Sequence, residues 1–279
     1  MADNRPIGVM DSGLGGVSVL RALRENLPHE SFIYWADNAN APYGGKSREH
    51  IRQLAMTVAQ RLIDADVKVL VVACNTATSA AIDQMRQQFT IPVISMEPAI
   101  KPALTQGKDA ILMLATEATC HLERYRRLKQ RLDGEHRIID IPCSGWVECI
   151  EAHVGEKDAC LTMVRHTLQP YSQSKVNSIV LGCTHYPLIE HQIRSIAEEF
   201  WGAECQMFDG RKGTVSQLVR VLKQRGQQAE SIAPPTCILH ATNETEEYTS
   251  LMNQVLTSGK DGVIDPMRVE PLGQEGSWT

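Results

Sequence analysis

Two kinds of hydrophobic pattern alternate along the chain. Short apolar runs rich in valine, isoleucine and leucine are typical of buried strands. Between these runs, apolar side chains recur every three or four positions, which is typical of amphipathic helices. In the first part of the chain the pattern predicts strands at 7–10, 32–35 and 92–96 and a further strand that runs from 69 and stops at Cys74. Helices are predicted at 17–27, 51–63 and 82–89, with Ser47 as a possible N-cap.

The same alternation restarts near residue 109. It predicts strands at 110–115, 137–141 and 204–208, a strand from 179 that stops at Cys183, and helices at 122–132, 146–154, 159–168, 188–200 and 215–225. After a loop at 226–235, a strand near 237–240 and a helix near 244–256 can return to the first half, and the tail after 258 looks irregular. Strands that alternate with helices predict a doubly wound, flavodoxin-like α/β fold with mainly parallel sheets.

The two halves of this pattern resemble each other. Residues 7–12 are similar to residues 111–116, so that Thr116 follows Ser12 by 104 positions, and Cys183 follows Cys74 by 109. Nearly equal offsets predict two pseudo-symmetric α/β domains with the active site at their interface, although two apolar strands can also be alike by chance. We expect residues 1–97 and roughly 210–279 to form the first domain and residues 98–209 the second.

Composition narrows the class of protein. The 279 residues carry a net charge of −5 without a basic tract, which argues against nucleic acid as the main ligand. No apolar run approaches the roughly 18 residues that span a bilayer, and the first residues lack the features of a signal peptide. The eight cysteines include no Cys-x-x-Cys pair. We therefore expect a cytoplasmic protein with free thiols and no membrane partner.

Cys74 and Cys183 stand at the ends of two similar strands, with a threonine close behind each. The carboxyl ends of strands in open α/β sheets are where ligands bind. The pKa of a thiol is about 8.5 and shifts readily with its surroundings. One thiolate can remove a proton from a carbon while a thiol on the opposite side delivers another, which inverts a stereocentre without a cofactor.

Other polar residues follow the strand ends. Asp11 and His185 can assist the two thiols. The simpler interpretations are that Asp11 only caps a helix and that His185 is an ordinary loop histidine. The ligand can be anchored by Ser12, Asn75, Thr76 and Thr184 near helix starts. Tyr43, in the turn 42–45, can close over a ligand or belong to a simple surface turn.

Metal and cofactor sites find little support. Cys74, Cys183 and His185 could bind zinc, but a fourth ligand is not apparent. The segment 13–16 is not a Gly-x-Gly-x-x-Gly motif, which argues against a nicotinamide site. The remaining cysteines are expected to be buried and unreactive, namely Cys120, Cys143, Cys149, Cys160, Cys205 and Cys237.

At these positions the chain resembles the glutamate racemase family of the cofactor-independent aspartate/glutamate racemase superfamily. The matching segments are residues 8–16, 36–44, 73–78 and 181–188, with a weaker match at 142–147 and Glu151. Their order along the chain is specific to the family, and the resemblance covers most of residues 7–225.

The resemblance implies an isomerase that interconverts L- and D-glutamate without metal or cofactor, in a possible homodimer, and so supplies D-glutamate for bacterial peptidoglycan. It implies Cys74 and Cys183 as the proton donors and acceptors, assisted by Asp11 and His185, with Glu151 near His185. Substrate-binding positions implied by it are Asp11, Ser12, Tyr43, Gly44, Asn75, Thr76, Thr116, Thr119, Thr184 and His185.

The chain departs from the family pattern at two places, and three alternative functions are left open. Ser144 stands where the family usually has proline, and Asp209-Gly210-Arg211 replaces the usual Asp-Ser-Gly. A racemase for aspartate or another amino acid would use the same chemistry. A decarboxylase of the superfamily commonly needs one catalytic cysteine, which the intact pair disfavours. A non-catalytic binding protein would not need the full set of proton-transfer residues.

Overall fold

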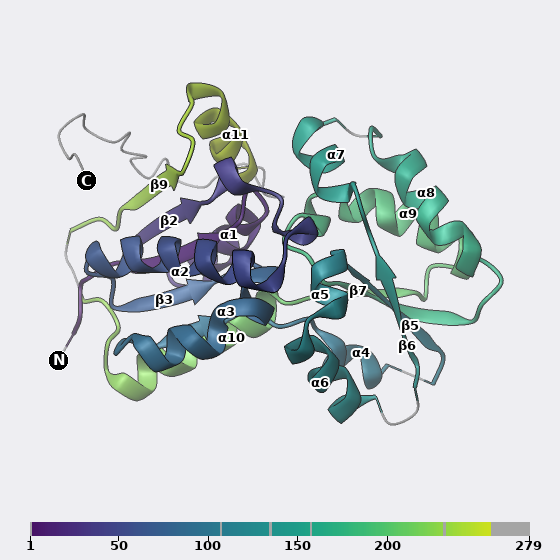
Figure 1. Ribbon diagram of the computed structural model, residues 1–279, viewed down its shortest axis with the longest axis horizontal. Coiled ribbons are helices and arrows are strands. Elements are labelled where there is room, and N and C mark those ends of the chain that lie inside the picture. Colours follow the sequence, from purple (N-terminus) through teal and green to yellow (C-terminus); the bar gives the residue numbers. More distant parts are fainter. Residues whose placement is uncertain (1, 107, 134–135, 157, 231–232, 258–279) are drawn as a thin grey trace.

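The computed structural model describes residues 2–106, 108–133, 136–156, 158–230 and 233–257. Within them the strands form a five-stranded sheet in the order β4-β3-β1-β2-β9 and a four-stranded sheet in the order β6-β5-β7-β8 (Figure 1). Every pair of neighbouring strands is parallel. The predicted α/β fold with mainly parallel sheets is confirmed. The tail after 258 lies outside the described residues.

The strands lie close to the predicted positions. The first sheet contains β1 (Ile7–Asp11), β2 (Phe32–Ala36), β3 (Val69–Val72), β4 (Val93–Ser95) and β9 (Cys237–Ala241). The second sheet contains β5 (Ala110–Ala115), β6 (Ile138–Pro142), β7 (Val176–Leu181) and β8 (Gln206–Asp209). The apolar runs form strands because both faces of each sheet are covered by helices, so successive side chains are buried on alternate sides.

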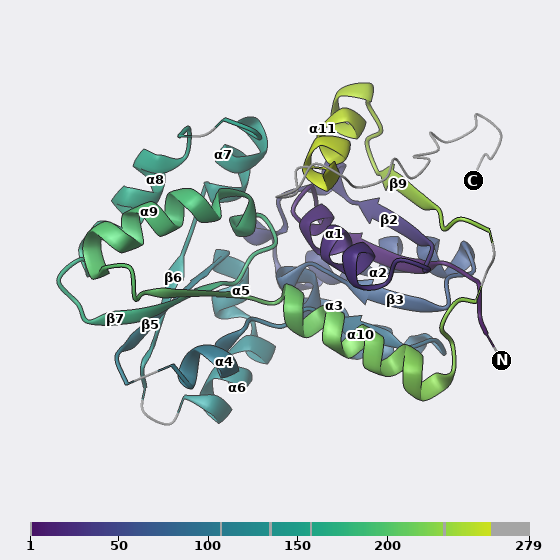
Figure 2. The same cartoon turned by 180° about the vertical axis from the view of Figure 1, so that it is seen from behind.

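Helices cover both faces of the first sheet (Figures 1 and 2). The helices α1 (Gly16–Asn26), α10 (Arg211–Arg225) and α11 (Glu246–Thr257) contribute Leu20, Leu218 and Met252 to one core. The helices α2 (Arg48–Asp64) and α3 (Asn75–Gln88) contribute Ala55 and Ile82 to the core on the other face. Ser47 caps α2 as expected, since its side chain accepts a hydrogen bond from the backbone N–H of His50.

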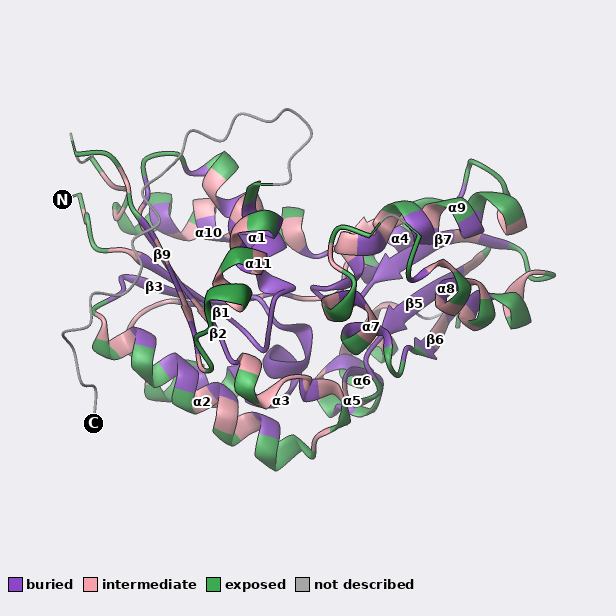
Figure 3. Cartoon of the chain, turned by 90° about the horizontal axis from the view of Figure 1, so that it is seen from above, coloured by how far each residue is buried: buried purple, intermediate pink, exposed green. Residues whose placement is uncertain are grey.

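The second sheet is covered in the same way, with its central strands β5 and β7 largely buried between two helical layers (Figure 3). The helices are α7 (Trp146–Ala152), α8 (Leu161–Leu168) and α9 (Glu190–Trp201) on one face, and α4 (Ile100–Leu104), α5 (Glu117–His121) and α6 (Glu123–Leu132) on the other. Short 3₁₀ turns lie at η1 (Asn38–Asn40), η2 (Tyr43–Gly45), η3 (Gln169–Tyr171) and η4 (Tyr186–Ile189). The prediction missed α4, α5, η1, η3 and η4 because they are too short to show a period, whereas η2 lies within the predicted turn 42–45.

The two sheets repeat one topology. The order β2-β1-β3-β4 in the first matches β6-β5-β7-β8 in the second. The pair Ile7↔Val69 corresponds to the pair Ile111↔Ser178, with the offsets that separate Ser12 from Thr116 and Cys74 from Cys183. The residue before each cysteine makes the same bond: Ala73 N donates to Met10 O at 2.9 Å, and Gly182 N donates to Leu114 O at 2.7 Å. Cys74 and Cys183 therefore occupy equivalent places in the two sheets.

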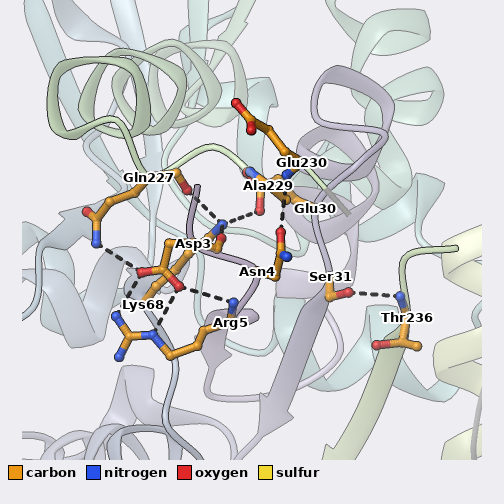
Figure 4. Close-up of polar contacts among 10 residues, drawn as sticks. All are labelled: Asp3, Asn4, Arg5, Glu30, Ser31, Lys68, Gln227, Ala229, Glu230 and Thr236. Atoms are coloured by element: carbon orange, nitrogen blue, oxygen red, sulfur yellow. Dashed lines mark hydrogen bonds and ion pairs between the residues drawn. The ribbon is translucent and has the colours of Figure 1, made fainter. Parts of the chain in front are cut away.

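The chain returns to the first sheet at its C-terminal end. Strand β9 pairs with β2, and the loop before it is held at the amino end of the sheet (Figure 4). The fully buried Lys68 places Nζ 2.6 Å from Glu30 Oε2 and donates to Gln227 O at 2.9 Å. The backbone N–H of Ala229 donates to Glu30 Oε1 at 2.9 Å. A buried ion pair thus fixes the loop that leads into β9.

The connections between the halves lie side by side. A Cβ atom on Gly210, between β8 and α10, would stand 2.7 Å from the carbonyl oxygen of Glu97, after β4. The domain boundaries at 97/98 and 209/210 stay a prediction. None of the described helices is both long enough and apolar enough to cross a membrane.

Candidate active site

The carboxyl ends of the two sheets face a common pocket. Cys74 and Cys183 both line it, although they come from different halves of the chain. The other lining residues are Ser12, Pro42, Tyr43, Gly44, Asn75, Thr76, Thr116, Val147, Thr184 and His185. The structure thus brings together most of the predicted site residues. Pro42 and Val147 were not predicted, because apolar side chains in a pocket wall carry no signal distinct from core residues.

A larger groove lies elsewhere between the halves, along α3, α6 and α10. It contains neither Cys74 nor Cys183, and its carboxylates pair with its basic side chains. Arg124, for example, contacts Asp83 at 2.9 Å and Glu97 at 2.6 Å. The smaller pocket is therefore the candidate for proton-transfer chemistry.

Cys74 lies at the start of α3, directly after β3. Its sulfur accepts a hydrogen bond from the backbone N–H of Ala77 at 3.4 Å and lies 3.5 Å from Ser12 Oγ. Burial and the negative charge of Asp11 raise the pKa of Cys74 to about 12, against the opposing effect of these two hydrogen bonds. At neutral pH this side chain is therefore a thiol, which can donate a proton.

Cys183 lies next to a charged pair. His185 Nδ1 is 3.7 Å from Cys183 Sγ, and His185 Nε2 is 2.7 Å from Glu151 Oε1. Burial alone would lower the pKa of His185, but hydrogen bonds with Cys183 and Glu151 outweigh burial and raise the pKa well above its ordinary value. Burial alone would likewise raise the pKa of Glu151, and the hydrogen bond from His185 lowers it instead. The imidazolium form of His185 thus faces the Cys183 sulfur.

Asp11 connects the two halves rather than contacting a thiol. Its Oδ1 accepts a hydrogen bond from Gly13 N at 2.9 Å, and its Oδ2 accepts one from Thr184 Oγ1 at 3.1 Å. Complete burial raises the pKa of Asp11, and the charge of His185 and these hydrogen bonds oppose the shift. Among the described residues, Ser12 rather than Asp11 contacts the Cys74 sulfur. Asp11 acts on Cys74 through its charge.

Asn75 offers polar atoms to a ligand. It is buried, it lines the pocket, and neither its Oδ1 nor its Nδ2 has a hydrogen-bond partner in the described structure. A buried amide without a partner is costly unless a ligand or water completes it. This observation supports the predicted role of Asn75 in substrate binding.

Three threonines join the halves beside Asn75. The Oγ1 atoms of Thr76, Thr116 and Thr119 form a triangle with sides of 3.0, 3.0 and 2.9 Å. Thr116 also caps α5, since its side chain accepts a hydrogen bond from Thr119 N. Thr76 and Thr116 line the pocket, whereas Thr119 is completely buried behind them.

The turn after β2 closes one side of the pocket. Tyr43 is buried and its hydroxyl donates to Asp37 Oδ2 at 2.6 Å. Burial and the charge of Asp37 raise the pKa of Tyr43, so the phenol stays neutral. Gly44 packs against the second half, since a Cβ there would lie 2.9 Å from Thr116 Cβ. Asp37 was not predicted as a site residue, although it directly follows the end of β2.

The other cysteines are buried as predicted, with one correction. Cys120, Cys143, Cys160, Cys205 and Cys237 are buried, but Cys149 is partly exposed. The prediction was wrong for Cys149 because it lies on the outer part of the short helix α7, with its sulfur 3.1 Å from Cys160 Sγ. Among the described residues, no three His, Cys, Asp or Glu side chains are arranged to hold a metal ion.

A family model that matches most of the chain shows which family the protein belongs to. The model of the Asp/Glu/Hydantoin racemase family matches residues 7–218. The chain belongs to the Asp/Glu/Hydantoin racemase family. Membership confirms the prediction that the protein is an isomerase of the racemase class.

Within this family, similar proteins include the glutamate racemases of Clostridium acetobutylicum and Bifidobacterium adolescentis. The first is 42% identical over 221 residues, which is 78% of this chain and 84% of the relative. The second is 36% identical over 260 residues, which is 92% of this chain and 99% of the relative.

Solved structures of racemases have the same fold. The glutamate racemase of Bacillus anthracis superposes with a TM-score of 0.83 at 26% identity, covering 98% of both chains. That of Francisella tularensis in complex with D-glutamate gives a TM-score of 0.80 at 27% identity, covering 96% of this chain and 98% of the other.

Proposed function

We propose that this racemase interconverts L- and D-glutamate by proton transfer at Cα between two thiols. The observation that carries the proposal is that Cys74 and Cys183 lie at equivalent strand ends and line one pocket. The proteins named above act as glutamate racemases, and the structures from Francisella tularensis and Escherichia coli contain D- and L-glutamate.

The reaction needs one thiolate and one thiol on opposite faces of Cα. The thiolate takes the Cα proton, so the C–H bond breaks, an S–H bond forms, and the electron pair stays on the substrate carbon. The opposite thiol then gives its proton to the other face of Cα and becomes the thiolate. No electrons are gained or lost, and the reverse reaction exchanges the roles of the two sulfurs.

The surroundings of the thiols differ in a way that assigns the starting roles. The raised pKa of Cys74 keeps a proton on that sulfur. His185 Nδ1 lies 3.7 Å from the Cys183 sulfur, and its hydrogen bonds with Cys183 and Glu151 raise the pKa of His185. In one direction of the reaction Cys74 therefore starts as the acid and Cys183 as the base, with Glu151 holding His185 beside Cys183.

The substrate is held by polar groups around the thiols. Asn75 supplies the amide that has no protein partner, and Ser12, Thr76, Thr116 and Thr184 supply hydroxyls beside it. Tyr43 and Gly44 form the wall that closes over the substrate. Thr119 holds the hydroxyls of Thr76 and Thr116 in place. Asp11 and His185 provide charge near the reacting carbon.

The cellular role follows from the product. We propose a cytoplasmic enzyme, with a homodimer as a possible assembly, that needs no metal or cofactor and supplies D-glutamate for bacterial peptidoglycan. Expression of the gene should restore growth of a bacterium that requires D-glutamate, and a Cys74→Ala variant should fail to do so.

Proton NMR in heavy water tests the reaction. Purified protein with L-glutamate and a chelator should lose the Cα proton signal as the optical rotation decays. Both Cys74→Ala and Cys183→Ala should abolish this, whereas Cys205→Ala, buried away from the pocket, should retain it. Racemisation at the wild-type rate by either pocket variant would contradict the two-thiol mechanism. Faster turnover of L-aspartate would assign the protein to the aspartate alternative.

A further inference from the structure

Thr242 and Asn243, which directly follow β9, form hydrogen bonds with the segment that leads from β2 to Tyr43. We call Thr242 and Asn243 the C-terminal clamp; β9 lies beside β2 in Figure 1. Thr242 N donates to Ala36 O at 2.8 Å. Asn243 N donates to Asn38 Oδ1, and Asn38 Nδ2 donates back to Asn243 O, both at 2.8 Å. The clamp therefore binds the segment before Tyr43 through hydrogen bonds to both its main chain and its side chains.

The hydroxyl of Thr242 reaches a buried carboxylate. It donates to Asp37 Oδ1 at 2.7 Å and accepts a hydrogen bond from Trp35 Nε1 at 3.3 Å. Asp37 is only 2% exposed, and Asn40 Nδ2 donates to the same oxygen at 3.0 Å. A buried carboxylate keeps its orientation only while its acceptor sites are filled. Thr242 is thus one of the groups that fix the plane of the Asp37 carboxylate.

The other oxygen of the same carboxylate holds Tyr43. The Tyr43 hydroxyl donates to Asp37 Oδ2 at 2.6 Å, and Asp37 N donates to Asp11 O at 3.0 Å. Tyr43 is 1% exposed and lines the pocket with both thiols. A single carboxylate therefore connects Thr242, at the edge strand of the sheet, to the pocket wall.

We infer that Thr242 is a positioning residue for substrate binding, acting through Asp37 on Tyr43. This inference rests on the proposed function and extends it to a residue beyond 218, where the family match ends. Loss of the Thr242 hydroxyl leaves Asp37 Oδ1 with fewer donors, so the carboxylate can rotate and Tyr43 loses its fixed partner. Because Thr242 contacts neither thiol, its loss weakens substrate binding more than proton transfer.

A double-mutant cycle separates this role from a general loss of stability. Steady-state KM and kcat for both glutamate isomers are measured for wild type, Thr242→Val, Tyr43→Phe and the double variant, with thermal unfolding measured in parallel. Thr242→Val should raise KM about tenfold with kcat within about twofold of wild type. Thr242→Ser keeps the hydroxyl and should have the KM of wild type. In the Tyr43→Phe background, Thr242→Val should change KM by less than about twofold.

Thr57→Val is the matched control, since the exposed Thr57 hydroxyl donates only to Gln53 O within α2. It should behave as wild type. Unchanged KM in Thr242→Val, or KM effects that multiply in the double variant, would overturn the inference while leaving the proposed function intact. A wild-type protein without activity on glutamate would overturn both. Should Thr242→Val not fold, Thr242→Ala removes the same hydroxyl and is measured in the same way.

Discussion

His185 Nε2 lies 2.7 Å from Glu151 Oε1, and the opposite side of the same imidazole faces Cys183. Glu151 stands on α7, whereas His185 follows β7, so the contact depends on how that helix packs on the second sheet. The carboxylate keeps the imidazole charged in a buried place where burial alone would make it neutral. The environment of one thiol is thus set by a residue that does not line the pocket with it.

Glu151→Gln should therefore lower activity and change its pH dependence. Without the carboxylate the pKa of His185 falls, and kcat/KM at neutral pH should drop roughly tenfold or more, with the loss growing as the pH rises. The control is Glu148→Gln, an exposed position on the same helix. A pH–rate profile that matches wild type would show that the pair has no part in the reaction.

Glu151→Gln should also lower the free energy of unfolding in a pH-dependent way. The raised pKa of His185 adds stability that is complete below its ordinary value of 6.5 and is lost as the pH rises through the folded-state value. The lowered pKa of Glu151 adds stability above its ordinary value of 4.5, which is lost as the pH falls through the folded-state value. Urea unfolding should show the largest destabilisation by Glu151→Gln, about 2 kcal/mol, between these two pH values. A constant difference from acid to alkaline pH would contradict the assignment.

Cys74 should react slowly with alkylating reagents. Since burial raises its pKa to about 12, the thiolate is scarce at neutral pH. The rate of carbamidomethylation at Cys74, followed by peptide mass spectrometry, should rise about tenfold per pH unit between about pH 7 and 9 without a plateau. In urea-unfolded protein the same cysteine should approach a plateau near pH 9. An early plateau in the folded protein would mean that Cys74 is already ionised.

Gly15→Ala should disable the pocket. A Cβ there would lie 2.6 Å from the backbone nitrogen of His185 and from Thr184 Oγ1, so the second half would have to move away. A displacement of this kind costs on the order of 100-fold in activity. Gly213→Ala, where a Cβ meets no atom within 4 Å, should keep full activity. Equal activity of the two variants would argue against a tight fit between the halves.

Lys68→Met should destabilise the protein while sparing its chemistry. It leaves the buried Glu30 without its cation, and breaking such a pair costs about 3–5 kcal/mol. Denaturant unfolding should show this loss, and Glu30→Leu in the same chain should recover part of it. Arg165→Gln breaks an exposed ion pair with Glu199 and should barely change the unfolding midpoint. A small effect of Lys68→Met would show that water reaches the site.

The strands and helices that could be predicted without a structure are those marked by a local hydrophobic pattern. Strands and most long helices lie within a few residues of the predicted positions, because burial on both faces requires continuous apolar runs and one-sided burial requires helical periodicity. The exception is α3, which begins at Asn75, seven residues before the predicted start at 82. Leu122 shows the limit. Its extended backbone separates α5 from α6, which corresponds to the predicted helix at 122–132, whereas the 5-residue α5 was missed because it is too short to show a period.

The sequence by itself determined the α/β fold class, the repeat, and the placement of Cys74 and Cys183 at strand ends, since each depends on neighbours along the chain. Only the tertiary structure decided that Ser12 contacts Cys74, that Asp37 holds Tyr43, and that Thr242 holds Asp37. Asp37 and Thr242 are 205 positions apart. Hydrogen bonds act over about 3 Å and depend on orientation, so contacts between distant segments are fixed by packing and strand register rather than by local pattern.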